Sequence, residues 1–470
     1  MSAPATTEKK YLKWYQKLAY GSGDLASNCS YGLVSSFVLL YLTGTLGLDS
    51  AIIGSLMLAS KVLDGISDVI FGTLIDRTHS KLGKARSWML FGQVGVSLCL
   101  FLLFAIPAGS TTMQYIYFFI VYTALNAVFY TANGIAYSSL VALITKNNNE
   151  RVQLGSFRFM FAVVTNIFMG FAVTGMVEKF GSGAAGWRTT ALIFAIVGLV
   201  VNTISCLAVK ELPEEELSGN TSEAAEEGKA VAEEKKHGFA ETAKILVHNK
   251  YYLMILAIYI VYYIMSNLTT GAGVFCATYY WGDGSLLGQF SMMKMFPVII
   301  ALAIAPVLIK KTGSMQKVNF WGYAISSVLG IPMIYFAMQK NLSMFLLFMF
   351  IKGIFAGTLS GSLNALIAEA SGYTTRTTGV HMDGMMYSCS SLGVKVGGGI
   401  GTAAVGWLLK LGGFVGTATV QSESAIRMIF NLYITFPFVI GIIITVLLAF
   451  LDVEKANKKW DAEHKKEAQA

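Results

Sequence analysis

Residues 51–76 read AIIGSLMLASKVLDGISDVIFGTLID, an apolar stretch that is interrupted by Lys61, Asp64 and Asp68. A charge in the hydrocarbon of a bilayer costs about 2.5–3.5 kcal/mol even on the mildest scale. Either this stretch lies outside a membrane, or its charges have a function inside one.

The composition of the whole chain decides between these alternatives. Of the 470 residues 54% are hydrophobic and 13% are charged, and the mean hydropathy is +0.59, far from the averages of soluble domains. Apolar segments of spanning length recur along nearly the whole chain. We predict an all-α membrane protein with twelve transmembrane helices, near residues 18–44, 49–75, 88–107, 112–143, 154–177, 189–208, 251–281, 285–309, 318–337, 342–369, 382–409 and 426–450.

The net charge of +8 is best interpreted by where Lys and Arg fall between the predicted spans. Of the 35, five lie within predicted spans, 25 fall on one side of the membrane, and five fall on the other: Lys179, Arg188, Lys340, Lys410 and Arg427. Positive residues favour the cytoplasmic side, so we expect both termini in the cytoplasm and the chain in the cell membrane. The charge indicates topology and attraction to lipid headgroups, and we expect no nucleic-acid partner.

One long polar interruption divides the spans into two sets of six. The sequence predicts a cytoplasmic N-terminal segment, a six-helix bundle, a cytoplasmic central loop, a second six-helix bundle and a cytoplasmic tail, at residues 1–17, 18–208, 209–250, 251–451 and 452–470. GTLIDRTHSKLGKARS after the second span and PVLIKKTGSMQKV after the eighth both combine a basic cluster with a Gly. This similarity favours a duplication, as in the parallel repeats of some secondary transporters.

No signature of an enzyme, a cofactor site or a metal site competes with this interpretation. The sequence has no P-loop and no H-E-x-x-H motif, and its five cysteines lie within predicted spans without C-x-x-C spacing. A sensor would need a folded output domain, for which the central loop and tail are too short and polar. We expect a non-enzyme without a cofactor, which functions as a monomer.

The spacing of Lys61, Asp64 and Asp68 places all three on one face of a helix, over about two turns. Two buried carboxylates repel each other unless one binds a proton or a cation lies between them. Such a pair can exchange H⁺ or Na⁺, the chemistry of a coupling site. The alternative is a charge cluster that only holds helices together, and we favour coupling because buried ionisable groups in spans are functional by default.

Other polar residues lie at membrane depth in other spans. Asp24 and Asn28 are four residues apart in the first span, and Asn133 and Tyr137 are four apart in the fourth. Arg158 and Lys395 are isolated cations that need anionic partners. Amides, charges and an aromatic face are what the recognition of sugar hydroxyls requires. For Tyr137 a structural role is about equally expected, and we assign no role to Lys294 and Lys352.

The chain resembles the glycoside-pentoside-hexuronide:cation symporter family of the major facilitator superfamily over nearly its whole length. The strongest similarity is LDGISDVIFGTLIDRTHSKLGKARSWML, with two aspartates four apart followed by D-x-T-x-S-[RK]-x-G-K. YGSGDLASN, SFRFMFA, SNLTTGAGVFCATYYWGD and YSCSSLGVKVGGG are similar to further family blocks. The resemblance implies two six-helix bundles of the major facilitator fold, which rock around a central cavity.

The resemblance also implies roles for single residues. The implied cation-binding residues are Asp64, Asp68, Ser67 and Thr131, which is next to Tyr130. The implied substrate-binding residues are Asp24, Asn28, Asn133, Tyr137, Arg158 and Lys395. The implied charge network is Lys61, Arg158, Lys395 and Asp383. The implied gating loop is Asp76, Arg77, Lys84 and Arg86.

The expected function is therefore symport of a small glycoside, pentoside or hexuronide with a coupling cation. Asn28 and Asn133 stand where the family's best-known member has sugar-binding aspartates, which removes two negative charges and suits a hexuronide or a xyloside. Ser67 replaces an asparagine ligand, so both H⁺ and Na⁺ remain open. A cation-coupled lipid or lysolipid carrier of the same fold is the alternative, and it would need an apolar slot open to lipid.

Overall fold

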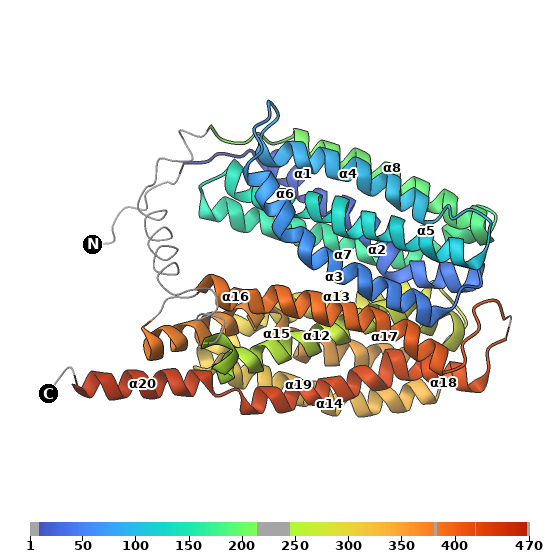
Figure 1. Cartoon of the computed structure of the whole chain (residues 1–470). Coiled ribbons are helices and arrows are strands. Elements are labelled where there is room, and N and C mark those ends of the chain that lie inside the picture. Colours follow the sequence, from blue (N-terminus) through green and yellow to red (C-terminus); the bar gives the residue numbers. More distant parts are fainter. Residues whose placement is uncertain (1–8, 214–244, 380–382, 419, 468–470) are drawn as a thin grey trace. The chain divides into compact units, whose positions relative to one another are not determined.

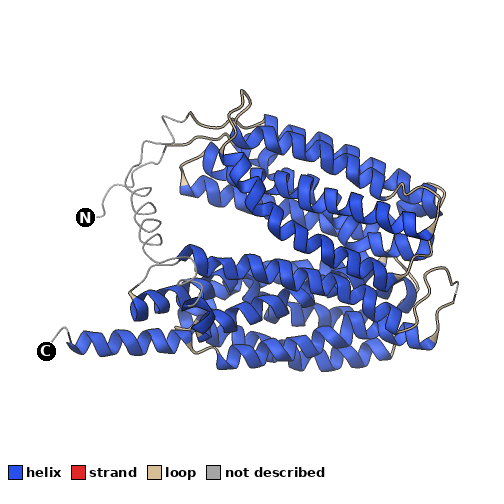
Figure 2. Ribbon diagram, in the orientation of Figure 1, coloured by secondary structure: helices blue, strands red, loops and turns tan. Residues whose placement is uncertain are grey.

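The computed structural model describes residues 9–213, 245–379, 383–418 and 420–467, and every regular element in these ranges is helical (Figure 2). The N-terminal half contains α1 (Trp14–Gly21), α2 (Gly23–Leu40), η1 (Tyr41–Thr45), α3 (Ser50–Asp76), α4 (Lys84–Leu103), α5 (Thr111–Thr123), η2 (Ala124–Tyr130), α6 (Thr131–Ile144), α7 (Asn148–Lys179) and α8 (Gly183–Leu207). Segments labelled η are short π-helical turns.

The C-terminal half continues the same pattern of long helices, shown in Figure 1. It contains α12 (Lys250–Phe275), η3 (Cys276–Tyr280), α13 (Leu286–Thr312), α14 (Met315–Met338), α15 (Leu342–Thr378), α16 (Asp383–Leu392), η4 (Gly393–Gly397), α17 (Gly398–Leu411), α18 (Glu423–Phe430), η5 (Asn431–Thr435), α19 (Phe436–Phe450) and α20 (Val453–Glu467). The prediction of an all-α membrane protein is confirmed.

Eleven helices in the described ranges are long and apolar enough to cross a membrane. The remaining predicted span is α3, which carries Lys61, Asp64 and Asp68 and is 27 residues long. At 1.5 Å per residue its length is about 40 Å, enough to cross the hydrocarbon layer. The prediction of twelve spans is thus confirmed by length and composition for eleven of them.

Side chains at the helix ends explain where several spans begin. Asp49 precedes α3, and its Oδ1 accepts hydrogen bonds from the backbone N–H groups of Ala51 and Ile52 at 2.9 and 3.3 Å. Asn341 caps α15 by accepting from the N–H of Met344 at 3.1 Å. The first N–H groups of a helix have no partner within it, so these caps help both helices to start at those residues.

The chain forms two compact units. Unit 1 comprises Met1–Gly219, Gly273–Gln289 and Gly406–Ile426, and unit 2 comprises Asn220–Ala272, Phe290–Val405 and Arg427–Ala470. Two short segments from the C-terminal half therefore pack in unit 1. There Ser50 Oγ donates to the carbonyl of Gly406 at 2.9 Å, and Lys410 Nζ lies 2.6 Å from Asp49 Oδ2.

The same device caps one helix in each unit. In unit 1 the carboxylate of Glu211, just after α8, accepts from the N–H groups of Lys84, Ala85 and Arg86 at 2.8–3.0 Å, where α4 begins. In unit 2 the carboxylate of Glu454, just after α19, accepts from the first N–H groups of α14 at 2.8 and 3.1 Å. In each half, a residue just after the last span thus caps the third span, which supports the predicted duplication.

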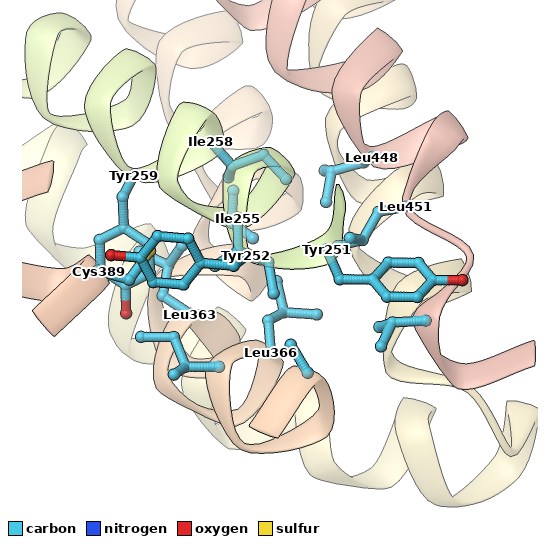
Figure 3. Close-up of a cluster of buried hydrophobic side chains, with 14 of the residues drawn as sticks. Tyr251, Tyr252, Ile255, Ile258, Tyr259, Leu363, Leu366, Cys389, Leu448 and Leu451 are labelled. Atoms are coloured by element: carbon cyan, nitrogen blue, oxygen red, sulfur yellow. The ribbon is translucent and has the colours of Figure 1, made fainter. Parts of the chain in front are cut away.

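Each unit has an apolar core, while large apolar side chains also cover its outside. The core of unit 2, drawn in Figure 3, joins α12, α15 and α19 through buried side chains such as Tyr251, Ile255 and Leu366. On α3, the exposed side chains include Val62, which is 62% exposed, and Val69, which is 73% exposed. Many exposed apolar side chains are expected on a surface that faces lipid and not water.

Candidate functional site

The charged face of α3 contacts the fourth predicted span. Lys61 Nζ lies 3.5 Å from Asp64 Oδ2, and the hydroxyl of Thr131, at the start of α6, lies 2.6 Å from Asp64 Oδ1. Lys61, Asp64 and Asp68 are all half-buried, whereas their apolar neighbours on α3 point outward. The structure therefore brings together Asp64 and Thr131 of the predicted cation site and Lys61 of the predicted charge network.

The position of Thr131 depends on the π-helical segment η2, which ends at Tyr130. The Thr131 hydroxyl lies 2.9 Å from the carbonyl of Asn126, five residues earlier, as well as 2.6 Å from Asp64. A hydroxyl has one hydrogen and two lone pairs, so it donates to one of these oxygens at a time. It can donate to ionised Asp64, or accept from protonated Asp64 while it donates to Asn126. The hydroxyl thus serves both protonation states of the carboxyl group.

Two tyrosines complete the surroundings of Lys61. Its ammonium lies 5.7 Å from the centre of the Tyr31 ring, which stacks on the ring of Tyr130 at 5.3 Å. Aromatic faces stabilise an adjacent cation and exclude water from it. Tyr31 was not among the residues that the sequence singled out, because one tyrosine in an apolar span carries no distinguishing signal.

Ser67, predicted as a cation ligand, donates its hydroxyl to the main-chain carbonyl of Asp64 at 2.9 Å. This local bond within α3 is common for serine in a helix, and it occupies the hydroxyl hydrogen while leaving the oxygen's lone pairs available. Asp68 lies one turn after Asp64 on the same face. Among the described residues, no group of three or more His, Cys, Asp or Glu side chains comes together as a metal site.

A second charged cluster lies between α2 and α7. Arg158 Nε lies 2.6 Å from Asp24 Oδ2, and the Arg158 guanidinium stands 4.2 Å from the centre of the Tyr137 ring. The structure thus brings together three of the predicted substrate residues. The Tyr137 side chain is only 2% exposed, and the ring of Tyr20 lies 4.7 Å away. The Tyr137 ring thus has Arg158 and Tyr20 among its neighbours, its hydroxyl lies 3.4 Å from Asp24 Oδ2, and a stacked sugar stays a prediction.

The two asparagines at the predicted sugar positions have different surroundings. Asn28 is half-buried, and its Oδ1 accepts a hydrogen bond from Asn166 Nδ2 of α7 at 2.9 Å. Asn133 is 3% exposed, and its Nδ2 donates to Gln93 Oε1 of α4 at 2.7 Å. Asn28 therefore joins α2 to α7, as the Asp24–Arg158 pair does, whereas Asn133 joins α6 to α4. Gln93 and Asn166 are partners that the sequence did not single out.

The remaining predicted site residues lie elsewhere in the chain. Lys395 is in η4 of unit 2, whereas Asp64 and Arg158 belong to unit 1. Asp383 begins α16, and its side chain is outside the described part of the structure. A charge network that links these residues stays a prediction.

The predicted gating loop joins α3 to α4. Asp76 ends α3, and Arg77 follows it as the cap residue. Arg86 is 9% exposed, and its Nε donates to the carbonyl of Cys206 at 3.0 Å, so it ties α4 to α8. Glu211, which binds the backbone of Lys84 and Arg86, was missed by sequence reasoning. An acidic residue directly after the sixth span is the signal that was available.

The chain is similar to known transport proteins along nearly its whole length. The sequence profile of the MFS/sugar transport protein family matches residues 19–455. The isoprimeverose transporter of Lactiplantibacillus pentosus is 26% identical over 471 residues, which cover 98% of this chain and 94% of that protein. The inner membrane symporter YicJ of Escherichia coli is 24% identical over 434 residues, covering 92% of this chain and 90% of that protein.

Solved structures of transporters share the fold. The crystal structure of a D-xylose-proton symporter matches with a TM-score of 0.63 and covers 94% of this chain and 98% of that chain. The sequence identity is 12%, so this likeness concerns the fold alone.

Proposed function

The chain belongs to the MFS/sugar transport protein family, and from this premise we propose that it is a symporter that moves a glycoside, pentoside or hexuronide together with a cation. The observation that carries the proposal is the cluster of Lys61, Asp64 and Thr131 inside unit 1. An ionisable group at this depth is costly, and a coupling ion that binds and leaves gives it a function. The protein is a transporter and not an enzyme.

The relatives support a sugar as the solute. One is an isoprimeverose transporter, and another is a symporter, and both are similar along more than nine-tenths of this chain. The Asp24–Arg158 pair and the Asn28–Asn166 pair supply charged and amide groups in unit 1 that suit a hydroxylated solute. A lysolipid carrier would need an apolar slot in the place of these groups.

The coupling step is a change in the charge at Asp64. An ion that binds there neutralises the carboxylate and releases Lys61 from its 3.5 Å contact. Coupling requires that the occupied ion site and the sugar favour each other's binding, after which the loaded carrier reorients by rocking of its two bundles. The two-way hydrogen bonding of Thr131 supports H⁺ as the ion, and Na⁺ bound by Asp64 and Asp68 is the alternative.

The setting of this activity is a cell membrane, in which we place both termini on the cytoplasmic side. The excess of Lys and Arg in alternate loops supports that orientation. The transporter works as a monomer, with membrane lipids around it and without a cofactor. The solute and the coupling ion are its small-molecule partners.

Uptake by proteoliposomes tests the proposal. With a radiolabelled glycoside outside, an inward proton or sodium gradient is expected to drive accumulation by the unmodified protein. Asp64→Asn keeps the shape of the side chain but cannot ionise, so gradient-driven accumulation is expected to fall to the level of empty vesicles. Asp68→Asn is tested in parallel, and Asp461→Asn on α20, which removes a partly exposed ion pair with Arg376, is the control. Full accumulation by both Asp64→Asn and Asp68→Asn contradicts the coupling assignment.

A further inference from the structure

A cavity of about 180 Å³ lies inside unit 2, between α12, α13, α14, α15 and the η5–α19 helix. Two lysines, Lys294 of α13 and Lys352 of α15, line it, and none of its described lining residues is Asp or Glu. The coupling and sugar residues Asp64 and Arg158 belong to unit 1 and are not among the residues that line this cavity.

Close packing of two helices brings the lysines to the same cavity. A Cβ atom at Gly353 of α15 would lie 2.8 Å from Cβ of Pro297 in α13, and one at Gly357 would lie 2.7 Å from Cβ of Ala301. Only glycine at these two positions allows the backbones to approach so closely. The Cβ position at Gly353 is also 3.7 Å from the carbonyl of Met293. Lys352 and Lys294 are the immediate chain neighbours of Gly353 and Met293.

The polar groups around the lysines do not neutralise them. Lys294 Nζ donates to the hydroxyls of Thr269 and Thr270 at 3.2 and 3.4 Å, which are long, neutral contacts. Lys352 has no hydrogen bond or ion pair with any residue that the structure describes. The ammonium group of each lysine carries a desolvation cost in a membrane-embedded cavity. A bound anion would offset this cost.

The rest of the wall suits a small anion with an organic part. Tyr262, Ser266 and Ser360 are among its lining residues. The hydroxyls of Tyr262 and Ser360 lie 2.8 Å apart and share one hydrogen bond, so one of their two hydrogens remains to be donated to an oxygen atom of a ligand. Tyr433 and Phe438 add aromatic surface. We propose that Lys294 and Lys352 form a binding site for an oxyanion, a carboxylate, sulfonate or phosphate group, within unit 2. The anion is either the acidic group of the transported solute, a source that rests on the proposed function, or a free inorganic anion.

Thermal unfolding of the purified full-length protein in detergent tests the site. The probes are methyl glucuronide, the uncharged methyl glucoside and inorganic phosphate. Methyl glucuronide or phosphate is expected to raise the unfolding midpoint of the unmodified protein. Lys294→Gln and Lys352→Gln are each expected to raise the concentration of methyl glucuronide or phosphate that is needed for this shift in the midpoint. The expected increase is about tenfold or more, because each substitution removes a charge-assisted hydrogen bond. Lys317→Gln, at an exposed lysine of α14 in the same unit, is expected to leave this concentration unchanged.

The outcomes separate the possible sources of the anion. A response to methyl glucuronide but not to phosphate assigns the site to the solute's acidic group, and a response to both assigns it to oxyanions in general. Failure of all oxyanions to stabilise the unmodified protein overturns the proposal, as does an unchanged response in both glutamine variants. Lys294→Arg and Lys352→Arg keep the charge and are expected to keep the response. Asp64-dependent uptake of an uncharged glycoside reports on the proposed function independently of the lysines.

Discussion

Thr131 shows what one hydroxyl can contribute to a coupling site. Its oxygen is 2.6 Å from Asp64 Oδ1 and 2.9 Å from the carbonyl of Asn126, so its single hydrogen has two possible acceptors. When Asp64 is ionised the hydrogen favours the carboxylate, and when Asp64 is protonated the hydroxyl can accept and turn to Asn126. Switching between these states costs one hydroxyl rotation, without movement of a helix.

Thr131→Val tests this role at the scale of one residue. Valine keeps the shape of threonine but leaves Asp64 without this donor, and hydrogen bonds to charged groups contribute about 1.5–3 kcal/mol. The lost bond stabilises the ionised carboxylate, so we expect Asp64 to bind H⁺ at least tenfold more tightly, measured as a shift of the pH dependence of glycoside uptake to higher pH. Thr131→Ser restores the hydroxyl and is expected to restore most of the original pH dependence. Equal pH dependence in Thr131→Val and the unmodified protein would rule out this role.

At the scale of the elements, the ends of the helices are tied together by acidic side chains that lie outside the spans. Glu211 caps α4 with three backbone hydrogen bonds, and Glu454 caps α14 with two and also accepts from the hydroxyl of Ser314. The negative charge of each carboxylate also complements the positive end of the helix dipole. Each cap joins the third and the last span of its half.

Glu211→Ala and Glu454→Ala are therefore expected to destabilise the protein. Loss of a helix N-cap costs about 0.5–2 kcal/mol, and we expect the upper part of that range because several N–H groups lose their partner together. The measurement is the unfolding midpoint in detergent, which should fall in both variants. Glu463→Ala, which removes only an exposed pair with Lys459 on α20, is the control and should leave the midpoint unchanged. Equal unfolding midpoints in all three variants would show that the two caps do not contribute to the stability of the folded protein.

The π-helical segments change the register of the side chains within the spans. Among the described residues, η2, η4 and η5 interrupt predicted spans, whereas η1 and η3 lie at the ends of spans. Of the residues of the predicted site, Thr131 directly follows η2 and Lys395 lies in η4. A π-turn shifts the register of the side chains that follow it, and such turns are frequent at functional sites. Regular helical periodicity therefore misplaces residues beyond each interruption, which is one reason why the partners of the fourth span could not be predicted from spacing.

At the scale of the whole molecule, the distribution of Lys and Arg predicts the orientation in the membrane. All five native cysteines are buried, so a single exposed cysteine can report on each side. We expect Ala184→Cys to react with a membrane-impermeant maleimide in intact cells. Ala462→Cys, on α20, is expected to react only after the cells are lysed. Labelling of Ala462→Cys in intact cells would reverse the proposed orientation, and the unmodified protein is the control for background labelling.

The sequence by itself determined the class of the protein, its spans and the charged face of α3. Hydropathy and the spacing of Lys61, Asp64 and Asp68 are local properties of the sequence. They are sufficient here because a segment in lipid must form its own backbone hydrogen bonds, and therefore a helix, whatever it packs against. They predicted twelve spans, of which the structure confirms eleven by length and composition, and α3 is a helix, as the predicted charged face requires.

Only the tertiary structure decided which groups meet. It paired Asp64 with Thr131 and Asp24 with Arg158, and it buried Asn133 against Gln93. It also brought two unassigned lysines to one cavity. The physical reason is that each contact joins spans far apart in the chain, and close glycine crossings and π-turns set which faces touch. No local pattern contains that information.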